Sequence, residues 1–179
     1  SNWNGTETFT YKANDGSLDS NTATVTITVA AVNDAPVASN VSGSTDEDTA
    51  KAITLSATDV EGSSLTYSIV SNPSNGSLGS VSGTSVTYTP SSNWNGTDTF
   101  TYKANDGTVD SNTATVTVTV VAVNDLPIAN DISISMDMDD NIVFNIDVSD
   151  SDDDSLSKTT ITQPSNGTLL PGVGLEYTY

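Results

Sequence analysis

The sequence contains no cysteine, no histidine and no arginine, and these absences narrow the possible roles. Without cysteine, no disulfide can stabilise the fold, and the redox compartment of the protein cannot be inferred from cysteine usage. Four lysines face 23 acidic residues, so the net charge is −19, which argues against binding to nucleic acid or an anionic membrane surface. Serine is plentiful but has no evident base, and no glycine-rich loop suits a phosphate, so we expect that the protein is not an enzyme.

Long apolar runs are absent as well, and no signal peptide is recognisable, so we expect no membrane insertion. The apolar residues instead alternate with threonine. Thr22–Ala31 places Ala23, Val25, Ile27 and Val29 on one face and threonines on the other. This period of two is typical of a half-buried strand and favours an all-β fold.

One stretch of the sequence occurs twice. Residues 1–36 and 92–127 align without a gap at an offset of 91, and 30 of the 36 pairs are identical. A fixed period of this kind indicates a tandem array. We expect boundaries at the two V-N-D-x-P linkers, so residues 1–32 hold the last two strands of a repeat, 33–122 a complete repeat and 123–179 the first five strands of another. The chain therefore reads as part of a longer one.

The complete repeat shows seven candidate strands separated by Gly, Asn and Ser turns. Short strands at this spacing favour tandem Greek-key antiparallel β-sandwiches of about 91 residues per repeat. The expected strands are Val37–Gly43, Ala50–Thr58, Leu65–Ser71, Gly76–Val81, Ser85–Thr89, Thr97–Ala104 and Thr113–Ala122.

The final segment matches the complete repeat less closely. Its second strand is expected from the alternating Ile142, Phe144, Ile146 and Val148. Further on, Leu175-Glu176-Tyr177 is expected to match Val86-Thr87-Tyr88 after a deletion of two residues.

Strand direction sorts the acidic residues onto the two ends of each sandwich. Glu47 follows the first strand at the bottom, whereas Asp59, Glu61 and Asp106 follow upward strands at the top. Each joint between repeats therefore collects oxygen ligands from the unit below, the linker and the unit above. Such a set suits Ca²⁺, which takes about six to eight oxygen ligands, better than Mg²⁺, which keeps its waters. The alternative is that these residues only shape turns, as Asp and Gly often do.

These motifs resemble those of cadherins. DVEGSSLTYSI (Asp59–Ile69) is similar to the cadherin D-x-D-x-G motif with its following L-x-Y-x-I strand, and KANDG (Lys103–Gly107) with VNDLP (Val123–Pro127) resembles the end of a cadherin repeat and its linker. The nearest resemblance is to the bacterial cadherin-like, Ig-like tandem repeat of giant surface adhesins, with its NDAP, EDT, YTP and NGTDTFTY landmarks.

The resemblance implies a calcium-binding structural or adhesion repeat of a bacterial cell-surface or secreted adhesin, in which Ca²⁺ at the joints rigidifies an extended array. It also implies an extracellular location. Carried over position by position, it implies calcium ligands at Asp15, Asn33, Asp34, Glu47, Asp59, Glu61, Asp106, Asn124, Asp125, Asp150 and Asp152.

A second reading is a recognition module that binds carbohydrate, another cell-surface ligand or itself, as in calcium-dependent homophilic adhesion. Trp3 and Trp94, each within N-W-N-G, would then stack on a sugar; the alternative is that they plug the end of a sandwich.

The two partial repeats together would make about one unit. A ten-residue strand spans about 33 Å, whereas a four-residue linker reaches only about 13 Å, so the two cannot meet within one chain. We expect that Thr6–Ala31 of one molecule completes the open sandwich of the next, head to tail. The alternative is that both partial units are disordered.

Overall fold

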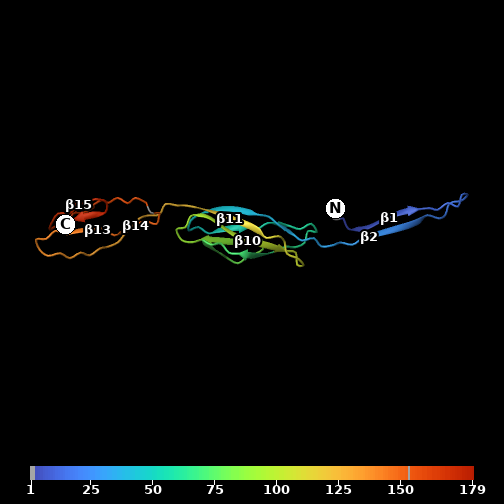
Figure 1. Ribbon diagram of the computed structural model, residues 1–179, viewed down its shortest axis with the longest axis horizontal. Helices are drawn as coiled ribbons and strands as arrows, with labels where there is room; N and C mark the ends of the chain where they lie inside the picture. Colours follow the sequence, from blue (N-terminus) through green and yellow to red (C-terminus); the bar gives the residue numbers. More distant parts are fainter. Residues whose placement is uncertain (1–2, 153) are drawn as a thin grey trace.

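The computed structural model describes residues 3–152 and 154–179. Residues 1, 2 and 153 lie outside the description, and the first two of these begin the first copy of the duplicated stretch. Three parts follow one another along the long axis (Figure 1). A hairpin of β1 (Gly5–Tyr11) and β2 (Ala23–Val29) lies at one end, a sandwich lies in the middle, and a smaller β-unit lies at the other end. Within the described residues, no helix is long and apolar enough to cross a bilayer.

The middle part is a two-layered β-sandwich that confirms the predicted fold class. One layer has the strand order β4-β11-β10-β7, and the other contains β5-β9-β8 and the short pair β3-β6. The bounds of these strands are β3 (Val37–Ala38), β4 (Val41–Asp46), β5 (Lys51–Thr54), β6 (Ala57–Thr58), β7 (Thr66–Ser71), β8 (Gly76–Leu78), β9 (Ser85–Pro90), β10 (Gly96–Asn105) and β11 (Ala114–Val121).

The first two predicted strands are each two strands in the structure. The first is divided between the two layers, and the second is interrupted between β5 and β6. The segment predicted as one strand over Val37–Gly43 is β3, which pairs with β6, followed by β4, which crosses to the other layer and pairs parallel with β11. Asn112 holds the crossing because its side chain accepts a bond from Ala38 N (2.9 Å) and donates one to Ala38 O (3.0 Å). The purely antiparallel pairing expected from the sequence is therefore wrong at this one edge.

The core lies between the two layers and consists of the predicted alternating residues. Phe100, Tyr102, Val116 and Val118 face inward from one layer and meet residues such as Tyr88 from the other. The Tyr102 hydroxyl lies 2.5 Å from Ser39 O and 2.7 Å from Ser56 O, so it joins the ends of β3 and β5–β6. Trp94 is half-buried and packs against this core, as expected of a residue that plugs the end of the sandwich.

Asp98 is a buried carboxylate inside the lower end of the sandwich. It accepts hydrogen bonds from Ser74 N (3.0 Å), Asn75 N (2.8 Å) and the Tyr88 hydroxyl (3.1 Å). Only 3% of Asp98 is exposed. Although the sequence places it near the bottom with the other acids, it orders the 73–76 turn and does not reach the joint.

The N-terminal hairpin repeats the pairing of β10 and β11. Phe9 pairs with Val25 and Tyr11 with Ala23, just as Phe100 pairs with Val116 and Tyr102 with Ala114. The hairpin is a separate two-stranded sheet. Its backbone register therefore forms without the second layer that covers its counterpart.

The C-terminal unit contains the counterpart of only one layer. Its strands are β12 (Ile128–Ala129), β13 (Val143–Asn145), β14 (Val148–Ser149), β15 (Leu170–Pro171) and β16 (Glu176–Thr178), paired as β12-β14 and β13-β16-β15. The predicted single strand through Ile142 and Val148 is thus two short strands, as in β5 and β6. No strand is assigned to residues 130–142, nor to the described residues of the later segment, 150–152 and 154–169.

The expected two-residue deletion is wrong, since the offset of 91 continues to the end of the chain. Ile142 and Tyr179 exchange backbone hydrogen bonds, just as Lys51 pairs with Tyr88 at the positions 91 residues earlier. Tyr179 contacts Gly167 as Tyr88 contacts Gly76. Tyr179, rather than Tyr177, is therefore the counterpart of Tyr88. The sequence pattern did not distinguish them, because L-x-Y and Y-x-Y fit the same strand in either register.

Candidate functional site

The joint between the middle and C-terminal units begins with Glu47. This residue follows β4 and is only 5% exposed. Its backbone N–H donates to Val121 O (2.9 Å), and its carboxylate oxygen Oε1 accepts a bond from Val123 N (2.5 Å). The loop below the sandwich is thereby fixed to the linker, and the Glu47 carboxylate is held at the joint.

The linker connects directly to acidic residues of the next unit. Asp125 N donates to Asp152 Oδ2 (2.6 Å), and Asp152 N donates to Asp150 Oδ1 (3.0 Å). Among the described residues, Asp150, Asp152 and Asp154 each offer a carboxylate oxygen within 4.8 Å of the others. Asp154 was not among the predicted ligands, although its place in the acidic run that starts at Asp150 was the available signal.

Asp125 is the electrostatic centre of this joint. Burial raises the pKa of its carboxyl group, and the negative charges of Asp152, Asp48, Glu47 and Asp150 raise it further. One oxygen, Oδ2, is buried and has no hydrogen-bond partner among the described residues. Carboxylates from below, from the linker and from above thus converge as predicted, and a buried acceptor remains for a proton or a cation.

Asn124 lies on the open side of the same joint. Its amide nitrogen donates to Asp125 O (2.7 Å). Its side chain borders a hollow of about 430 Å³ together with Asp152 and Asp154 from above and Asn93 and Asn95 from below. Oxygen-bearing side chains of both units therefore face one solvent-accessible space.

The joint between the hairpin and the middle unit brings together five more predicted residues. Asn33 Nδ2 donates to Asp106 Oδ2 (2.8 Å), and Asp34 N contacts Glu61 Oε2 (3.3 Å). Asp59 accepts a bond from Ser63 N through Oδ1 (2.9 Å), while its Oδ2 is buried without a hydrogen-bond partner among the described residues. The linker thus contacts the upper unit through two pairs of these residues, Asn33 with Asp106 and Asp34 with Glu61.

Asp106 has different electrostatics from Asp125. Its pKa is lowered, first by the hydrogen bond from Asn33 and then by those from the Val109 and Thr108 backbone. Because the carboxylate is stabilised by these donors, it stays ionised without a cation.

Asp15 is separated from the other predicted ligands. It lies in the turn between β1 and β2, at the end of the hairpin that points away from the middle unit (Figure 1). Its Oδ1 accepts bonds from Ser17 N (2.9 Å) and Leu18 N (2.8 Å), and these bonds lower its pKa. Asp106 accepts the same two turn bonds, from Thr108 N and Val109 N, but Asp15 lies away from both of the joints described above, so its role as a ligand stays a prediction.

Comparison with known proteins gives one relative by sequence and several by structure. Integrin beta-like protein A of Dictyostelium discoideum is 32% identical over 174 residues, which cover 83% of this chain and 9% of that protein. The extracellular cadherin domains 1–5 of protocadherin gamma B2 align with a TM-score of 0.46 and 18% identity, covering 88% of this chain and 34% of that one. An endo-fucoidan hydrolase of glycoside hydrolase family 107 aligns with a TM-score of 0.42 and 18% identity, covering 98% and 29% of the two chains.

The chain thus spans less than a tenth of the curated relative that it matches, and about a third of the solved structures. The family comparison covers more of the chain: the model of the bacterial Ig domain matches residues 1–28 and 33–119. These ranges include nearly all of the hairpin and of the middle sandwich, the two parts that share the duplicated stretch. By this match and by its two-layered fold, the chain belongs to the bacterial Ig domain family.

Proposed function

We propose that this chain is part of a calcium-stiffened array of Ig-like repeats, displayed outside a bacterial cell by a surface or secreted adhesin. Its role is structural: ions at the joints fix the angle between neighbouring units and keep the array extended. The proposal rests chiefly on Asp125, whose buried oxygen has no hydrogen-bond partner among the described residues and lies among four further carboxylates.

The chemistry of this ligand set favours calcium. Glu47, Asp125, Asp150 and Asp152 offer hard carboxylate oxygens, and Asn124 adds an amide oxygen at the same joint. Ca²⁺ accepts such a set with variable geometry. Asn33, Asp34, Asp59, Glu61 and Asp106 would hold an ion at the other joint. Affinities of about 10⁻⁴–10⁻³ M are typical of extracellular calcium modules and would suffice.

Calorimetric titration with calcium tests the proposal on the full chain. We expect Asp125→Asn and Asp152→Asn each to remove or weaken by at least about tenfold the binding at the second joint, since each loses a charged ligand. Asp19→Asn is the matched control, because it removes one exposed carboxylate in the distal turn of the hairpin. Equal calcium binding by all four proteins would contradict the proposal.

A further inference from the structure

The first turn of the middle unit carries a residue in a rarely occupied backbone conformation. Asp48 has a φ of 56°, in the left-handed region, and a hydrogen bond from Thr49 N to Asp46 O (3.4 Å) closes the turn around it. Residues with a side chain adopt this region at a cost, and glycine, asparagine and aspartate are its usual occupants. Backbone geometry therefore explains a small polar residue at this position, but it does not explain a charged one.

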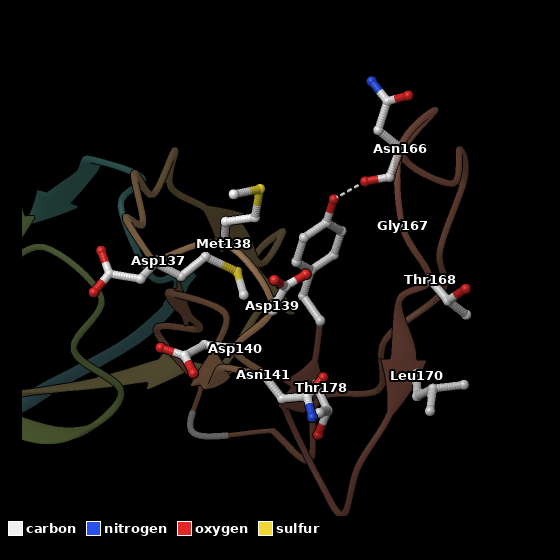
Figure 2. Close-up of a pocket in the computed structure, with 12 residues that line it drawn as sticks. Asp137, Met138, Asp139, Asp140, Asn141, Asn166, Gly167, Thr168, Leu170 and Thr178 are labelled. Carbon is white, nitrogen blue, oxygen red and sulfur yellow. Dashed lines mark hydrogen bonds between the residues drawn. The ribbon is translucent and has the colours of Figure 1, made fainter.

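The same conformation recurs one repeat later. In the C-terminal unit, Asp139 has a φ of 71°, and Asp140 N donates to Asp137 O (3.4 Å), as in the turn of the middle unit. Figure 2 shows this second turn, in which Met138 stands where the middle unit has Glu47. The carboxylate in the left-handed position is thus present in both turns, although its acidic neighbour is not.

Asp48 also joins two loops at the lower end of the middle sandwich. Its Oδ1 accepts a hydrogen bond from Asn93 N (3.1 Å), and among the described residues its Oδ2 accepts none. Asn93 begins the N-W-N-G stretch and is itself left-handed, with a φ of 51°. The stretch is therefore held by Trp94 on the side of the core and by Asp48 on the side of the joint.

The asparagines on either side of the tryptophan face the joint. Asn93 and Asn95 border the hollow of about 430 Å³ described above, together with Asp152 of the next unit. At the other joint, a hollow of about 220 Å³ is bordered by Asn4 and Glu61, which are the counterparts of Asn95 and Asp152. An amide from the unit below and a carboxylate from the unit above therefore face one space at both joints.

The negative charge of Asp48 is unfavourable where it lies. This charge raises the pKa of the Asp125 carboxyl group, and its effect is larger than that of Glu47. Neighbouring carboxylates disfavour one another's ionised form unless a cation lies among them. Asp125 Oδ2 is buried without a hydrogen-bond partner among the described residues, so an acceptor for such a cation already lies at this place.

We propose that Asp48 supplies a carboxylate ligand to calcium at the joint between the middle and C-terminal units, and that Asn95 supplies an amide oxygen there. The inference rests on the proposed function and extends the site to a second loop of the lower unit. Calcium then connects the first turn and the N-W-N-G stretch of one unit to the linker and the acidic loop of the next. A mixed set of carboxylate and amide oxygens suits Ca²⁺, whose coordination geometry is variable.

Calorimetric titration of the full chain carrying Asp48→Asn tests the charge separately from the turn. Asparagine adopts the left-handed conformation readily and keeps an acceptor for Asn93 N, so only the charge is lost. We expect the calcium affinity at this joint to fall about tenfold. Asp46→Asn is the matched control in the same turn, because Asp46 lies with the exposed residues of β4. It should change the affinity by less than about twofold.

Thermal unfolding of the same variant distinguishes a ligand from a residue that only shapes the turn. In chelator, Asp48→Asn should melt at the same temperature as the wild type or higher, because one of several repelling charges is gone. In calcium, it should melt below the wild type, because it gains less from the bound ion. An equal difference in melting temperature in both buffers would overturn the inference.

Asn95→Asp tests the amide in the opposite direction. A carboxylate at this position should tighten calcium binding about threefold or more, since a higher ligand charge raises the affinity. Asn21→Asp is its matched control, since it adds the same charge at an exposed position of the hairpin, just before β2.

The outcomes separate this inference from the proposed function. Equal calcium binding by Asp48→Asn and the wild type, or unchanged or weaker binding by Asn95→Asp, would overturn the inference and leave the site around Asp125 standing. A wild type that binds no calcium would overturn both.

Discussion

Individual buried polar residues fix the lower end of the middle sandwich. Asp98 provides acceptors for two backbone N–H groups and for the Tyr88 hydroxyl, although only 3% of this residue is exposed. Burial, followed by the hydrogen bond to Asp98 and its negative charge, raises the pKa of Tyr88 to about 12. The two residues therefore depend on each other, and each can be tested by itself.

The raised pKa of Tyr88 predicts a loss of stability in alkali. The folded state binds the phenolic proton more tightly than the unfolded state, whose pKa stays near 10. The contribution is complete below pH 10 and is lost as the pH rises towards 12, at a cost of about 2 kcal/mol. Urea unfolding across this interval measures it, and Tyr88→Phe should lack this part of the decrease. An equal decrease in the variant would assign it to other groups.

Replacement of Asp98 tests the buried hydrogen bonds directly. Asp98→Ala leaves the N–H groups of Ser74 and Asn75 without an acceptor, and unsatisfied buried donors of this kind cost about 1–3 kcal/mol each. We expect urea unfolding to show a loss of about 2–4 kcal/mol. Asp46→Ala, which removes an exposed carboxylate in the same unit, should change the value by no more than about 0.5 kcal/mol. Similar losses in both variants would contradict the assigned role.

At the scale of strands, the edge strand β8 requires a residue without a side chain at one position. A Cβ atom at Gly76 would lie 2.6 Å from the Tyr88 ring and 2.7 Å from Thr89 O, whereas one at Gly79 would lie 3.7 Å from its nearest neighbour. Neither glycine has a positive φ, so the comparison isolates packing. The same contact recurs between Gly167 and Tyr179.

The two glycines therefore give a matched pair of substitutions. Gly76→Ala must displace the buried Tyr88 ring or the β9 backbone, and overpacking of this kind costs about 2–3 kcal/mol. Gly79→Ala meets ordinary van der Waals contacts and should cost less than about 0.5 kcal/mol. Thermal and urea unfolding measure both, and an equal effect at the two positions would show that backbone entropy rather than packing matters here.

Much of this arrangement could be predicted from the sequence. The alternation of apolar residues correctly gave the core and the positions of most strands, although three predicted strands are each two short ones. Strand direction correctly brought Glu47, Asp125, Asp150 and Asp152 to one joint. Alternation shows which residues point inward but not which layer a strand joins. The crossing from β3 to β4 could not be predicted in this way, because it depends on Asn112, more than 70 residues away. The register of the last strand is the remaining error, because the L-x-Y and Y-x-Y patterns of residues 175–179 fit the same strand equally well.

At the scale of the whole molecule, the carboxylates of Glu47, Asp48, Asp125, Asp150 and Asp152 lie close enough to interact at the joint between the middle and C-terminal units. The proposed calcium sites predict that chelation lowers the melting temperature of the joined units and increases their relative motion. At a calcium concentration ten times the dissociation constant, linkage gives about 1.4 kcal/mol per site. Calorimetry and small-angle scattering, with and without chelator, measure the two effects, and magnesium at equal ionic strength serves as the control. An unchanged profile and melting temperature in chelator would refute calcium at the joints.

The parallel pairing of β4 with β11 has a consequence for a molecule that is stretched from its ends. These strands lie near the entry and exit of the middle unit, and their pairing extends from Val41 to Asp46 opposite Val116 to Val121. Tension along the array therefore slides the two strands past each other and loads their hydrogen bonds simultaneously, in shear. An antiparallel edge would instead break its hydrogen bonds one after another, and would unfold at a much smaller force.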